Sequence, residues 1–465
     1  MRRGPVALCA LLLFTFAVSP AMAQQSIVPG GAAAGPPSRS PEVIPDQYIV
    51  ELHHGASVDA VSRGHRVTPA VRFGLINGFA ARMSHAAVTA LSRDPRVRRV
   101  SPDLVVRAYA KPSSPPGKTK NSGGSSGGGD TPTCPAPVLV TPEEIPAGVA
   151  RIGAPGAWAV TTGAGVKVAV IDTGIDLCHP DLAANYLAGI NYVSSGQPPK
   201  DDNGHGTHVA GIIAAAQDGS GVVGVAPNAK LLVAKALDAN GSGSLSTVVT
   251  AIDWAVAQGA HVINLSLGAV DFWCSALGVC GAGAECTAIS NAVAKGVVVV
   301  VAAGNSADEA RFYTPANCRD SLTVTALDAS DTFAWFSNYS EFYWDVDGTT
   351  GLAIGDHPVV DLAAPGVNVL STMPTYDATL TASYGKTHGR LSGTSMATPH
   401  VAGAAALYIA SPASAGATAD QVRQALVSRG ECAGSAAPAG TIVCELGWSL
   451  DPDGVWEPLV DASSF

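Results

Sequence analysis

The sequence is poor in charged residues, which make up only 14% of its 465 residues. About 25% is usual for a soluble domain, so a highly solvated helical bundle fits poorly. The charged residues comprise 27 basic and 37 acidic side chains, and the net charge of −10 argues against nucleic acid as the main partner. No run beyond the first residues reaches about 18 uninterrupted apolar residues, so we expect no membrane span. The 47% of hydrophobic residues, by contrast, supply an ample core and exclude disorder throughout.

The first 23 residues have the pattern of a secretory signal. Arg2 and Arg3 provide a positive start, residues 6–18 form an apolar run, and Ala21-Met22-Ala23 fits a small-x-small cleavage site. The apolar run is too short for a typical membrane span. We therefore expect a secreted, extracellular protein.

Cysteine usage agrees with export. Nine cysteines are present; Cys9 leaves with the signal, and the even number that remains indicates disulfide bonds in an oxidising compartment. No spacing is typical of a zinc finger, so a structural zinc site is not expected. Spacing alone does not fix the connectivity; the local pairs that we favour are Cys274 with Cys280, Cys286 with Cys318, and Cys432 with Cys444.

Composition divides the chain into six segments. Stretches rich in Gly, Ser and Pro flank two parts in which apolar strands and helices alternate, because such stretches bury too little apolar surface to fold. The expected segments are a signal at 1–23, a flexible leader at 24–45, a small domain at 46–108, a Gly/Ser/Pro-rich linker at 109–145, a large domain at 146–445, and a C-terminal tail at 446–465, to which the sequence assigns no role.

The small domain is predicted to be an α+β unit of the ferredoxin-like type. Its patterning indicates the order β-α-β-β-α-β, which is the split βαβ arrangement. Ser84 is the expected N-cap of the second helix. The expected strands are 48–52, 79–83 and 97–106, and the expected helices are 56–63 and 84–93.

The large domain is predicted to be α/β, with a mostly parallel sheet covered by helices on both faces. Several apolar runs are unbroken, as in strands that are buried on both sides. Helical stretches closed by glycines lie between them, and this alternation implies a parallel sheet. The expected strands are 166–171, 231–236, 262–267 and 297–302, and the expected helices are 246–258 and 287–295.

Three segments of the large domain carry side chains suited to nucleophilic catalysis. Asp172 follows a buried strand in the run IDTGID, at the strand end where α/β sheets place their sites. His205 lies in NGHGTHVAGIIAA, and Ser395 opens the apolar helix of GTSMATPHVAGAAALYIA. Each motif alone is also explained by a turn or by close packing. Together they supply a hydroxyl nucleophile, an imidazole base and a carboxylate that orients the base.

Asn305 completes this set. It follows the apolar run at 297–303, and its side-chain amide could donate a hydrogen bond to a tetrahedral oxyanion. A turn residue is the alternative, because asparagine tolerates the left-handed conformation. The helix that begins near Ser395 would add backbone N–H groups and a positive dipole end close to the developing negative charge.

Three other functions are suggested by parts of the sequence. His205 and His208 could bind a metal, but a glycine replaces the glutamate of H-E-x-x-H. DTG is a hallmark of aspartic proteases, but no second DTG or DSG follows in the chain. A protease fold used only for binding is disfavoured because residues for all four roles are present. We therefore favour a serine hydrolase.

The motifs resemble those of the subtilisin-like serine proteases, the subtilase family (peptidase S8). The similarity covers about 151–444, and the order Asp, His, Ser along the chain is the one that these enzymes use. It implies a subtilisin-like fold and a serine endopeptidase that works through an acyl-enzyme intermediate. It also implies that Asp172 orients the imidazole, His205 is the general base and acid, Ser395 is the nucleophile and Asn305 the oxyanion donor. The motifs are Asp172-Thr-Gly, His205-Gly-Thr-His-Val-Ala-Gly, Ala302-Ala-Gly-Asn305 and Gly393-Thr-Ser-Met-Ala-Thr-Pro-His-Val-Ala-Gly403.

Residues 46–108 resemble the inhibitory propeptide of the same family, which assists folding, blocks the site and is removed by the enzyme. The resemblance implies a self-processing zymogen. Residues 46–109 carry a net charge of about +4 and those from Arg151 onward about −16. These charges fit docking of the propeptide, although two independently soluble surfaces explain them as well. The mature chain would begin within 109–151, at a bond that the sequence does not identify.

The resemblance also implies substrate contacts. Ser266, Leu267 and Gly268 are similar to the segment that pairs with an extended peptide in this family, and Ala303 and Gly304 would line the primary pocket.

The insert at 271–286, with three cysteines, lies outside the family signature. We expect it to form a disulfide-tied surface loop near the peptide-binding edge.

No cofactor is implied for the chemistry, and the sequence does not identify metal ligands. Asp181 and Asp218 lie where some family members place calcium ligands, so a structural Ca²⁺ ion is an expectation from the resemblance. The expected partners are polypeptide substrates and the chain's own propeptide. We expect a monomer, with neither nucleic acid nor membrane among its partners.

Overall fold

The computed structural model describes residues 39–109, 142–340, 342–346, 353–432, 451–452 and 457–465. For 342–346 and 353–358 it describes the backbone. The expected signal and most of the expected leader and linker lie outside these ranges. The described residues belong to one compact unit, Ser38–Phe465.

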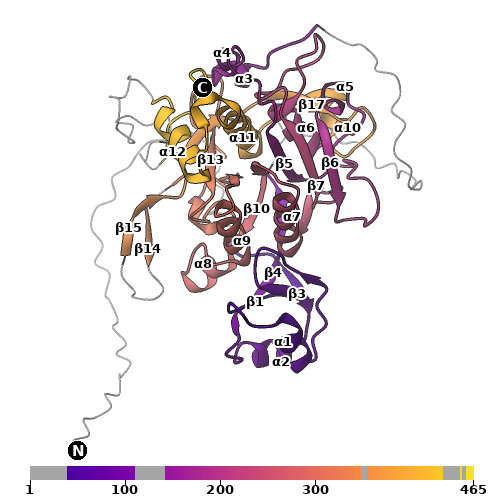
Figure 1. Cartoon of the computed structure of the whole chain (residues 1–465), viewed down its shortest axis with the longest axis vertical. Helices are drawn as coiled ribbons and strands as arrows, with labels where there is room; N and C mark the ends of the chain where they lie inside the picture. The colour runs from indigo at the N-terminus through magenta and orange to yellow at the C-terminus, as the bar shows by residue number, and fades with distance from the viewer. Residues whose placement is uncertain (1–38, 110–141, 341, 347–352, 433–450, 453–456) are drawn as a thin grey trace, which may run out of the picture. The chain divides into compact units, whose positions relative to one another are not determined.

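The small domain has the predicted order β-α-β-β-α-β, with an antiparallel sheet in the order β4-β1-β3-β2 (Figure 1). Serine side chains begin both helices: Ser57 accepts a hydrogen bond from the backbone of Ala60, and Ser84 from that of Ala87. The N-cap predicted at Ser84 is therefore confirmed. The elements are β1 Val43–Leu52, α1 Val58–Gly64, β2 Val71–Arg72, β3 Gly78–Arg82, α2 His85–Leu91 and β4 Val97–Ala108.

The large domain is built on a seven-stranded parallel sheet, as predicted. Its strand order is β16-β13-β11-β9-β5-β7-β6, and every pairing in it is parallel. The strands are β5 Lys167–Asp172, β6 Tyr186–Asn191, β7 Lys230–Lys235, β9 Val262–Leu265, β11 Val298–Ala302, β13 Leu322–Leu327 and β16 Leu362–Pro365.

Helices cover both faces of this sheet (Figure 1). Alternate residues of β5 point to opposite faces, because successive side chains of a strand alternate. Val168 and Val170 belong to the core cluster that contains α6 His205–Ala214 and α11 Thr394–Ala410. Ala169 and Ile171 belong to the cluster that contains α7 Leu245–Ala257 and α9 Ala284–Val293. The unbroken apolar runs of the sequence are thus explained by burial on both faces.

Shorter elements complete the described fold. The helices are α3 Ala147–Arg151, α4 Ala154–Ala157, α5 Pro180–Ala183, α8 Phe272–Leu277, α10 Thr381–Tyr384, α12 Ala419–Arg429, and the 3₁₀ turns Ala310–Phe312 and Pro412–Ser414. The strands are β8 Ser242–Ser244, β10 Leu267–Val270, β12 Tyr313–Thr314, β14 Phe342–Val346, β15 Ala353–Pro358, β17 Val369–Met373 and β18 Thr387–Leu391.

One expected strand is divided in the structure. The sequence predicts a single strand at 262–267, but β9 ends at Leu265 and a separate strand, β10, begins at Leu267. Ser266 lies between them, and its hydroxyl donates a hydrogen bond to the carbonyl of Ser395. The break therefore turns the chain out of the parallel sheet and into an antiparallel pairing with β4.

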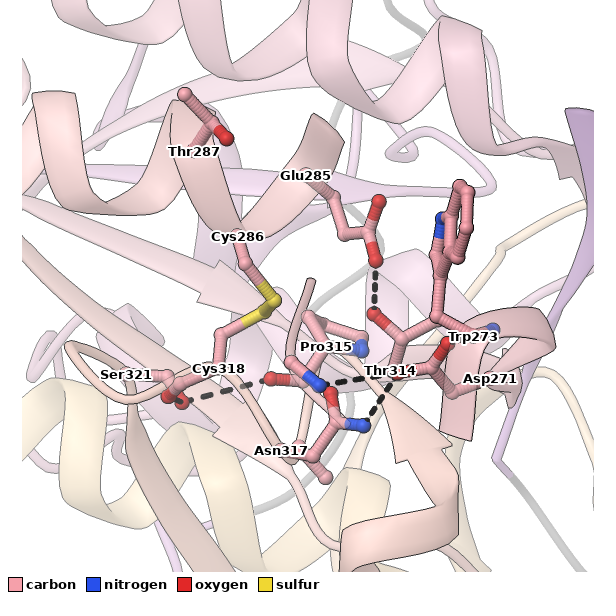
Figure 2. The surroundings of a disulfide bond; sticks show 12 residues. Asp271, Trp273, Glu285, Cys286, Thr287, Thr314, Pro315, Asn317, Cys318 and Ser321 are labelled. Carbon is pink, nitrogen blue, oxygen red and sulfur yellow. Dashed lines mark hydrogen bonds between the residues drawn. A yellow bond between two sulfur atoms is a disulfide. The ribbon is translucent and has the colours of Figure 1, made fainter. Parts of the chain in front are cut away.

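Two of the expected disulfide bonds are confirmed, Cys274–Cys280 and Cys286–Cys318. The second connects α9 to the segment after β12 (Figure 2). Cys178 and Cys432 are disulfide-bonded as well. The expected pair of Cys432 with Cys444 falls partly outside the described residues.

The end of the C-terminal tail packs on the large domain. Leu459 forms bridges with Ala363 and Glu431, and the ring of Phe465 lies 5.4 Å from that of Tyr408, centroid to centroid. These residues extend the main core. No described helix combines the length and the apolar character that crossing a membrane requires.

Candidate active site

The carboxylate of Asp172 holds the ring of His205. Asp172 ends β5 and His205 begins α6, and both side chains are buried. Nδ1 of His205 lies 2.8 Å from Oδ1 and 2.9 Å from Oδ2 of Asp172. Among the described residues, Nε2 of His205 has no hydrogen-bond partner. A carboxylate on Nδ1 fixes the tautomer that leaves Nε2 able to accept a proton.

A second carboxylate, Asp201, ties the two loops together. Its Oδ1 accepts hydrogen bonds of 2.8 Å from the Thr173 hydroxyl and from the backbone of Gly204. Its Oδ2 accepts from the backbone and hydroxyl of Thr207, at 2.8 and 2.7 Å. Asp201 thereby satisfies free N–H groups at the start of α6 and positions His205. Sequence analysis missed this residue, for which the only signal is an acidic side chain just before NGHGTH.

Ser395 lies in the first turn of α11 and is buried. Its hydroxyl donates a hydrogen bond of 2.9 Å to the carbonyl of Ser266 and accepts one of 3.0 Å from the backbone N–H of Tyr109. Because Nε2 of His205 has no partner among the described residues, the imidazole and the hydroxyl are not hydrogen-bonded in this state. The two groups come from helices that pack on the same face of the sheet.

Asn305 also binds Tyr109, through its carbonyl rather than its N–H group. Its Nδ2 donates a hydrogen bond of 2.6 Å to the carbonyl oxygen of Tyr109. Its Oδ1 accepts from the backbone and the hydroxyl of Thr394, at 2.9 and 3.0 Å, so Thr394 sets the orientation of the amide. Gly393 is required here, because a Cβ at this position would lie 2.1 Å from the Tyr109 oxygen.

The end of the small domain runs through this site as an extended strand. Residues Val105–Arg107 of β4 pair antiparallel with β8, while Arg107 and Ala108 pair antiparallel with β10. The backbone N–H of Tyr109 also lies 3.3 Å from the carbonyl of Ser266. Each sheet pairing supplies backbone hydrogen bonds without demanding particular side chains. The segment thus occupies the position of an extended peptide.

The ring of Tyr109 lies against Gly268. A Cβ on Gly268 would be 2.3 Å from the Tyr109 hydroxyl and 2.7 Å from the carbonyl oxygen of Thr314. Burial raises the pKa of Tyr109 above its ordinary value. Nothing in the sequence distinguishes this tyrosine, because its role arises from contacts with residues far away along the chain, such as Asn305 and Ser395 at separations of 196 and 286 residues.

The predicted substrate-contacting residues fall into two groups. Ser266, Leu267 and Gly268 contact the docked segment through the backbone interactions above. Ala303 is buried in a small cluster with Tyr313, and a Cβ on Gly304 would lie 2.3 Å from Nδ2 of Asn338. These two residues therefore build the loop that carries Asn305.

The insert at 271–286 contains the short helix α8 in addition to the disulfide bond Cys274–Cys280. Asp271 caps α8, accepting from the backbone of Trp273 at 2.7 Å and from Nδ2 of Asn317 at 2.6 Å. The hydroxyl of Thr314 donates a hydrogen bond of 2.5 Å to Glu285. Burial, and then the Asp271 carboxylate, raise the pKa of Glu285 to about 7. This polar network supports β10 and β12 beside the docked strand.

The other functions considered from the sequence find no support in these contacts. Nε2 of His208 lies 3.0 and 3.2 Å from the carbonyl oxygens of Val369 and Gly389, and burial lowers the pKa of His208 to about 3. His208 is thus held by backbone carbonyls and His205 by Asp172, and among the described residues no cluster with metal-ligand spacing contains either histidine. Asp172 itself faces an imidazole rather than a second carboxylate.

The two residues expected to bind calcium have other hydrogen-bond partners in the structure. Asp181 is buried, and its Oδ2 lies 2.9 Å from both the backbone nitrogen of Val222 and Nε2 of His388. The oxygen of Asp218 instead accepts from Ser220, at the surface. Among the described residues, the one cluster of His, Cys, Asp and Glu with ligand spacing is Glu285 with Cys286 and Cys318, whose sulfurs are bonded to each other.

Comparison with known proteins places both domains in established families. The model of the subtilase family matches residues 163–439, and that of peptidase inhibitor I9 matches residues 54–109.

Individual relatives agree with the family models. Subtilisin NAT from Bacillus subtilis subsp. natto is 35% identical over 406 residues, which are 86% of each chain. Subtilisin Savinase from Lederbergia lenta is 44% identical over 266 residues, 57% of this chain and 84% of that protein. A solved structure, a cold adapted subtilisin-like serine proteinase, is 32% identical with a TM-score of 0.50 and covers 65% of this chain and 90% of that one.

Proposed function

This chain belongs to the subtilase family of serine endopeptidases, and on that premise we propose that it is exported as a precursor, cleaves itself after Tyr109 and then hydrolyses other polypeptides. The observation that carries the proposal is the double contact on one residue, Tyr109. Asn305 binds the carbonyl oxygen of Tyr109 while the Tyr109 N–H reaches the Ser395 hydroxyl. A carbonyl that is held by a donor beside a serine hydroxyl is ready for attack.

The proposed chemistry assigns one task to each side chain. The Ser395 hydroxyl turns from the Ser266 carbonyl toward the unpartnered Nε2 of His205, loses its proton to it and attacks the Tyr109 carbonyl carbon. Asp172 stabilises the imidazolium that forms, and Asn305 donates to the oxyanion.

The tetrahedral intermediate then collapses, and the C–N bond to Ala110 breaks as His205 returns the proton to the leaving amine. Water next enters, gives a proton to His205 and hydrolyses the acyl-enzyme. No cofactor takes part, as in subtilisins generally.

The expected boundaries follow this scheme as proposals. Residues 1–23 direct export, residues 46–108 are the inhibitory propeptide, and residues 146–445 are the catalytic domain, which the C-terminal tail follows. Cleavage at the bond between Tyr109 and Ala110 would separate the propeptide from the linker. The enzyme is proposed to be an extracellular monomer.

Substrates are proposed to be extended polypeptides with a large apolar or aromatic residue before the cleaved bond. Main-chain pairing with β8 and β10 supplies affinity with little sequence demand. The absence of a side chain at Gly268 leaves the room that the Tyr109 ring uses. Ala303 and Gly304 belong to the loop that closes this region.

The test is expression of the wild-type chain and the Ser395→Ala variant. We expect wild-type protein to yield a mature form, a released fragment that ends at Tyr109, and casein hydrolysis that a serine-directed covalent inhibitor abolishes. The variant should remain a full precursor without activity. EDTA and pepstatin serve as controls for metallo- and aspartic proteases. If the purified Ser395→Ala variant still cleaved itself at the same bond, the proposal would be refuted.

A further inference from the structure

Arg39, four residues before β1, contacts the large domain separately from the docked strand. Its Nε donates a hydrogen bond of 2.9 Å to Oδ2 of Asp308, and its Nη2 donates one of 2.6 Å to Oδ1. The two parallel bonds form a bidentate pair between groups that are 269 residues apart in sequence. This geometry is specific for a planar guanidinium.

The surroundings of Asp308 fit the same ligand. The guanidinium carbon of Arg39 lies 3.8 Å from the centroid of the Phe312 ring, within the range of a cation–π contact. The hydroxyl of Tyr313 donates a hydrogen bond of 3.1 Å to Oδ2 of Asp308, and Glu309 lies 3.7 Å from Nη2 of Arg39. The Asp308 carboxylate, the face of the Phe312 ring and the Glu309 carboxylate thus surround the guanidinium of Arg39.

Burial makes the charge of Asp308 depend on its partners. Only 3% of Asp308 is exposed. Burial by itself acts to raise the pKa of Asp308, but hydrogen bonds from Arg39 and its neighbours outweigh it and hold that pKa below the ordinary value. Among the described residues Arg39 is the cation that pairs with Asp308. Glu309, by contrast, is also paired with Arg311.

Asp308 and Tyr313 lie on segments that also contact the residues expected to line the primary pocket. Asp308 lies three residues after Asn305, and its backbone N–H donates to Oδ1 of Asn338, whose Nδ2 donates to the Ala303 carbonyl. Tyr313 pairs with Val270 of β10, the strand that also binds the docked segment. The contact with Arg39 is therefore next to the substrate groove but separate from the strand that fills it.

We propose that Asp308, Phe312 and Tyr313 form a guanidinium-binding site, and that Arg39, in the segment just before the inhibitory propeptide, occupies it in the precursor as a second anchor of that domain. The proposal rests on the proposed function, because it concerns how the propeptide leaves the protease. After cleavage at Tyr109, the propeptide is held by two contacts, the strand 105–109 that follows the small domain in sequence and Arg39 that precedes it. Loss of Arg39 then leaves one anchor, so release becomes faster.

The main experiment measures how soon activity appears after the full-length chain has processed itself. On dilution of the processed complex, Arg39→Ala should shorten the lag before hydrolysis of a small chromogenic peptide by about tenfold, because a charge pair on a buried carboxylate is lost. The lag of the Arg39→Lys variant should lie between those of the wild type and Arg39→Ala. Lysine keeps the positive charge but cannot form the two parallel hydrogen bonds. Arg72→Ala is the matched control, because its partner Asp59 belongs to the propeptide itself and both side chains are half exposed. The final activity should be the same in all of these variants.

A double variant assigns the effect to the site. In an Asp308→Asn background, Arg39→Ala should change the lag no further. Equal lags for Arg39→Ala and Arg72→Ala would overturn the proposal, and so would an undiminished effect of Arg39→Ala in the Asp308→Asn background. A normal final activity in either case leaves the proposed function intact.

A second measurement needs no protease activity. In the Ser395→Ala precursor, docking should protect the peptide bond after Arg39 from added trypsin. Asp308→Asn should speed that cut about tenfold while the thermal unfolding midpoint confirms a folded precursor. An unchanged rate of cutting would overturn the inference even if the enzyme proved inactive for another reason.

Discussion

Nδ2 of Asn305 lies 2.6 Å from the carbonyl oxygen of Tyr109. The amide can make this contact because Thr394 binds its oxygen through both a backbone N–H and a hydroxyl. The donor is therefore oriented before any reaction begins. A donor fixed in advance stabilises developing charge without reorganisation during the reaction.

Replacement of this donor should slow turnover more than binding. We expect Asn305→Ala to lower kcat by about 10²–10³, the loss that the equivalent kind of change causes in subtilisin, with little change in KM. Steady-state kinetics on one peptide substrate measure both parameters. Asn228→Ala is the matched control, since Asn228 is exposed and its amide binds Thr162 at the surface. A change in KM with kcat unchanged would contradict this role of Asn305.

The pocket at Gly268 should determine the residue that precedes the cleaved bond. Gly268→Ala puts a methyl group where the Tyr109 ring lies, 2.3 Å from its hydroxyl. We expect the ratio of kcat/KM for a tyrosine substrate to that for an alanine substrate to fall at least about tenfold. Two peptides that differ only in that residue measure the ratio. Because the ratio cancels any general loss of activity, an unchanged value would show that tyrosine is bound elsewhere.

The buried carboxyl of Glu285 should make the precursor sensitive to pH. Its pKa is raised to about 7 by burial and by Asp271, with Glu51 of the propeptide adding to the effect. Below the ordinary glutamate pKa the group is neutral in folded and unfolded states alike. As the pH rises through about 7 the folded state must accept a buried charge, so its contribution to stability is lost, by on the order of 3 kcal/mol.

The measurement is chemical unfolding of the Ser395→Ala precursor between pH 4.5 and 8. Glu285→Gln, which resembles the neutral acid, should gain stability relative to the parent as the pH rises. The charged neighbours Arg98 and Arg99, at 3.8 and 3.4 Å from Glu51, are present in both proteins and cancel in the difference. A difference that stays constant across this range would show that Glu285 titrates normally.

Asp103 of the propeptide should contribute to docking by capping a helix of the protease. It is buried, and it accepts hydrogen bonds of 3.0 and 2.5 Å from the backbone and hydroxyl of Ser246 at the start of α7. Asp103→Ala should weaken docking by about 1 kcal/mol and speed release roughly fivefold, since a capping side chain and a favourable dipole contact are lost. The lag before activity gives the release rate. Asp59→Ala, which breaks an exposed pair within the propeptide, should leave the lag unchanged.

The parts of the fold that sequence could predict are those set by local patterning. Unbroken apolar runs indicate the parallel strands, and Ser84 begins a helix as its side chain requires. Asp172 and Asn305 are found because both follow such runs, at the strand ends where sites form.

The remaining parts depend on contacts between distant segments. Tyr109 is an unremarkable residue in a linker until β8 and β10 bind the strand before it. Arg39 likewise gains its role only from Asp308. The division of the 262–267 strand at Ser266 coincides with a hydrogen bond to Ser395 that no local pattern encodes.

The strands that flank the docked segment are short, three residues in β8 and four in β10. Once the propeptide departs, each has an open side able to recruit a strand from another molecule, which in most proteins invites aggregation. Here the recruited strand would lie across the nucleophile. On the proposed function, two mature molecules that associate through this surface would cleave each other rather than form a lasting assembly, and the bound propeptide would prevent this.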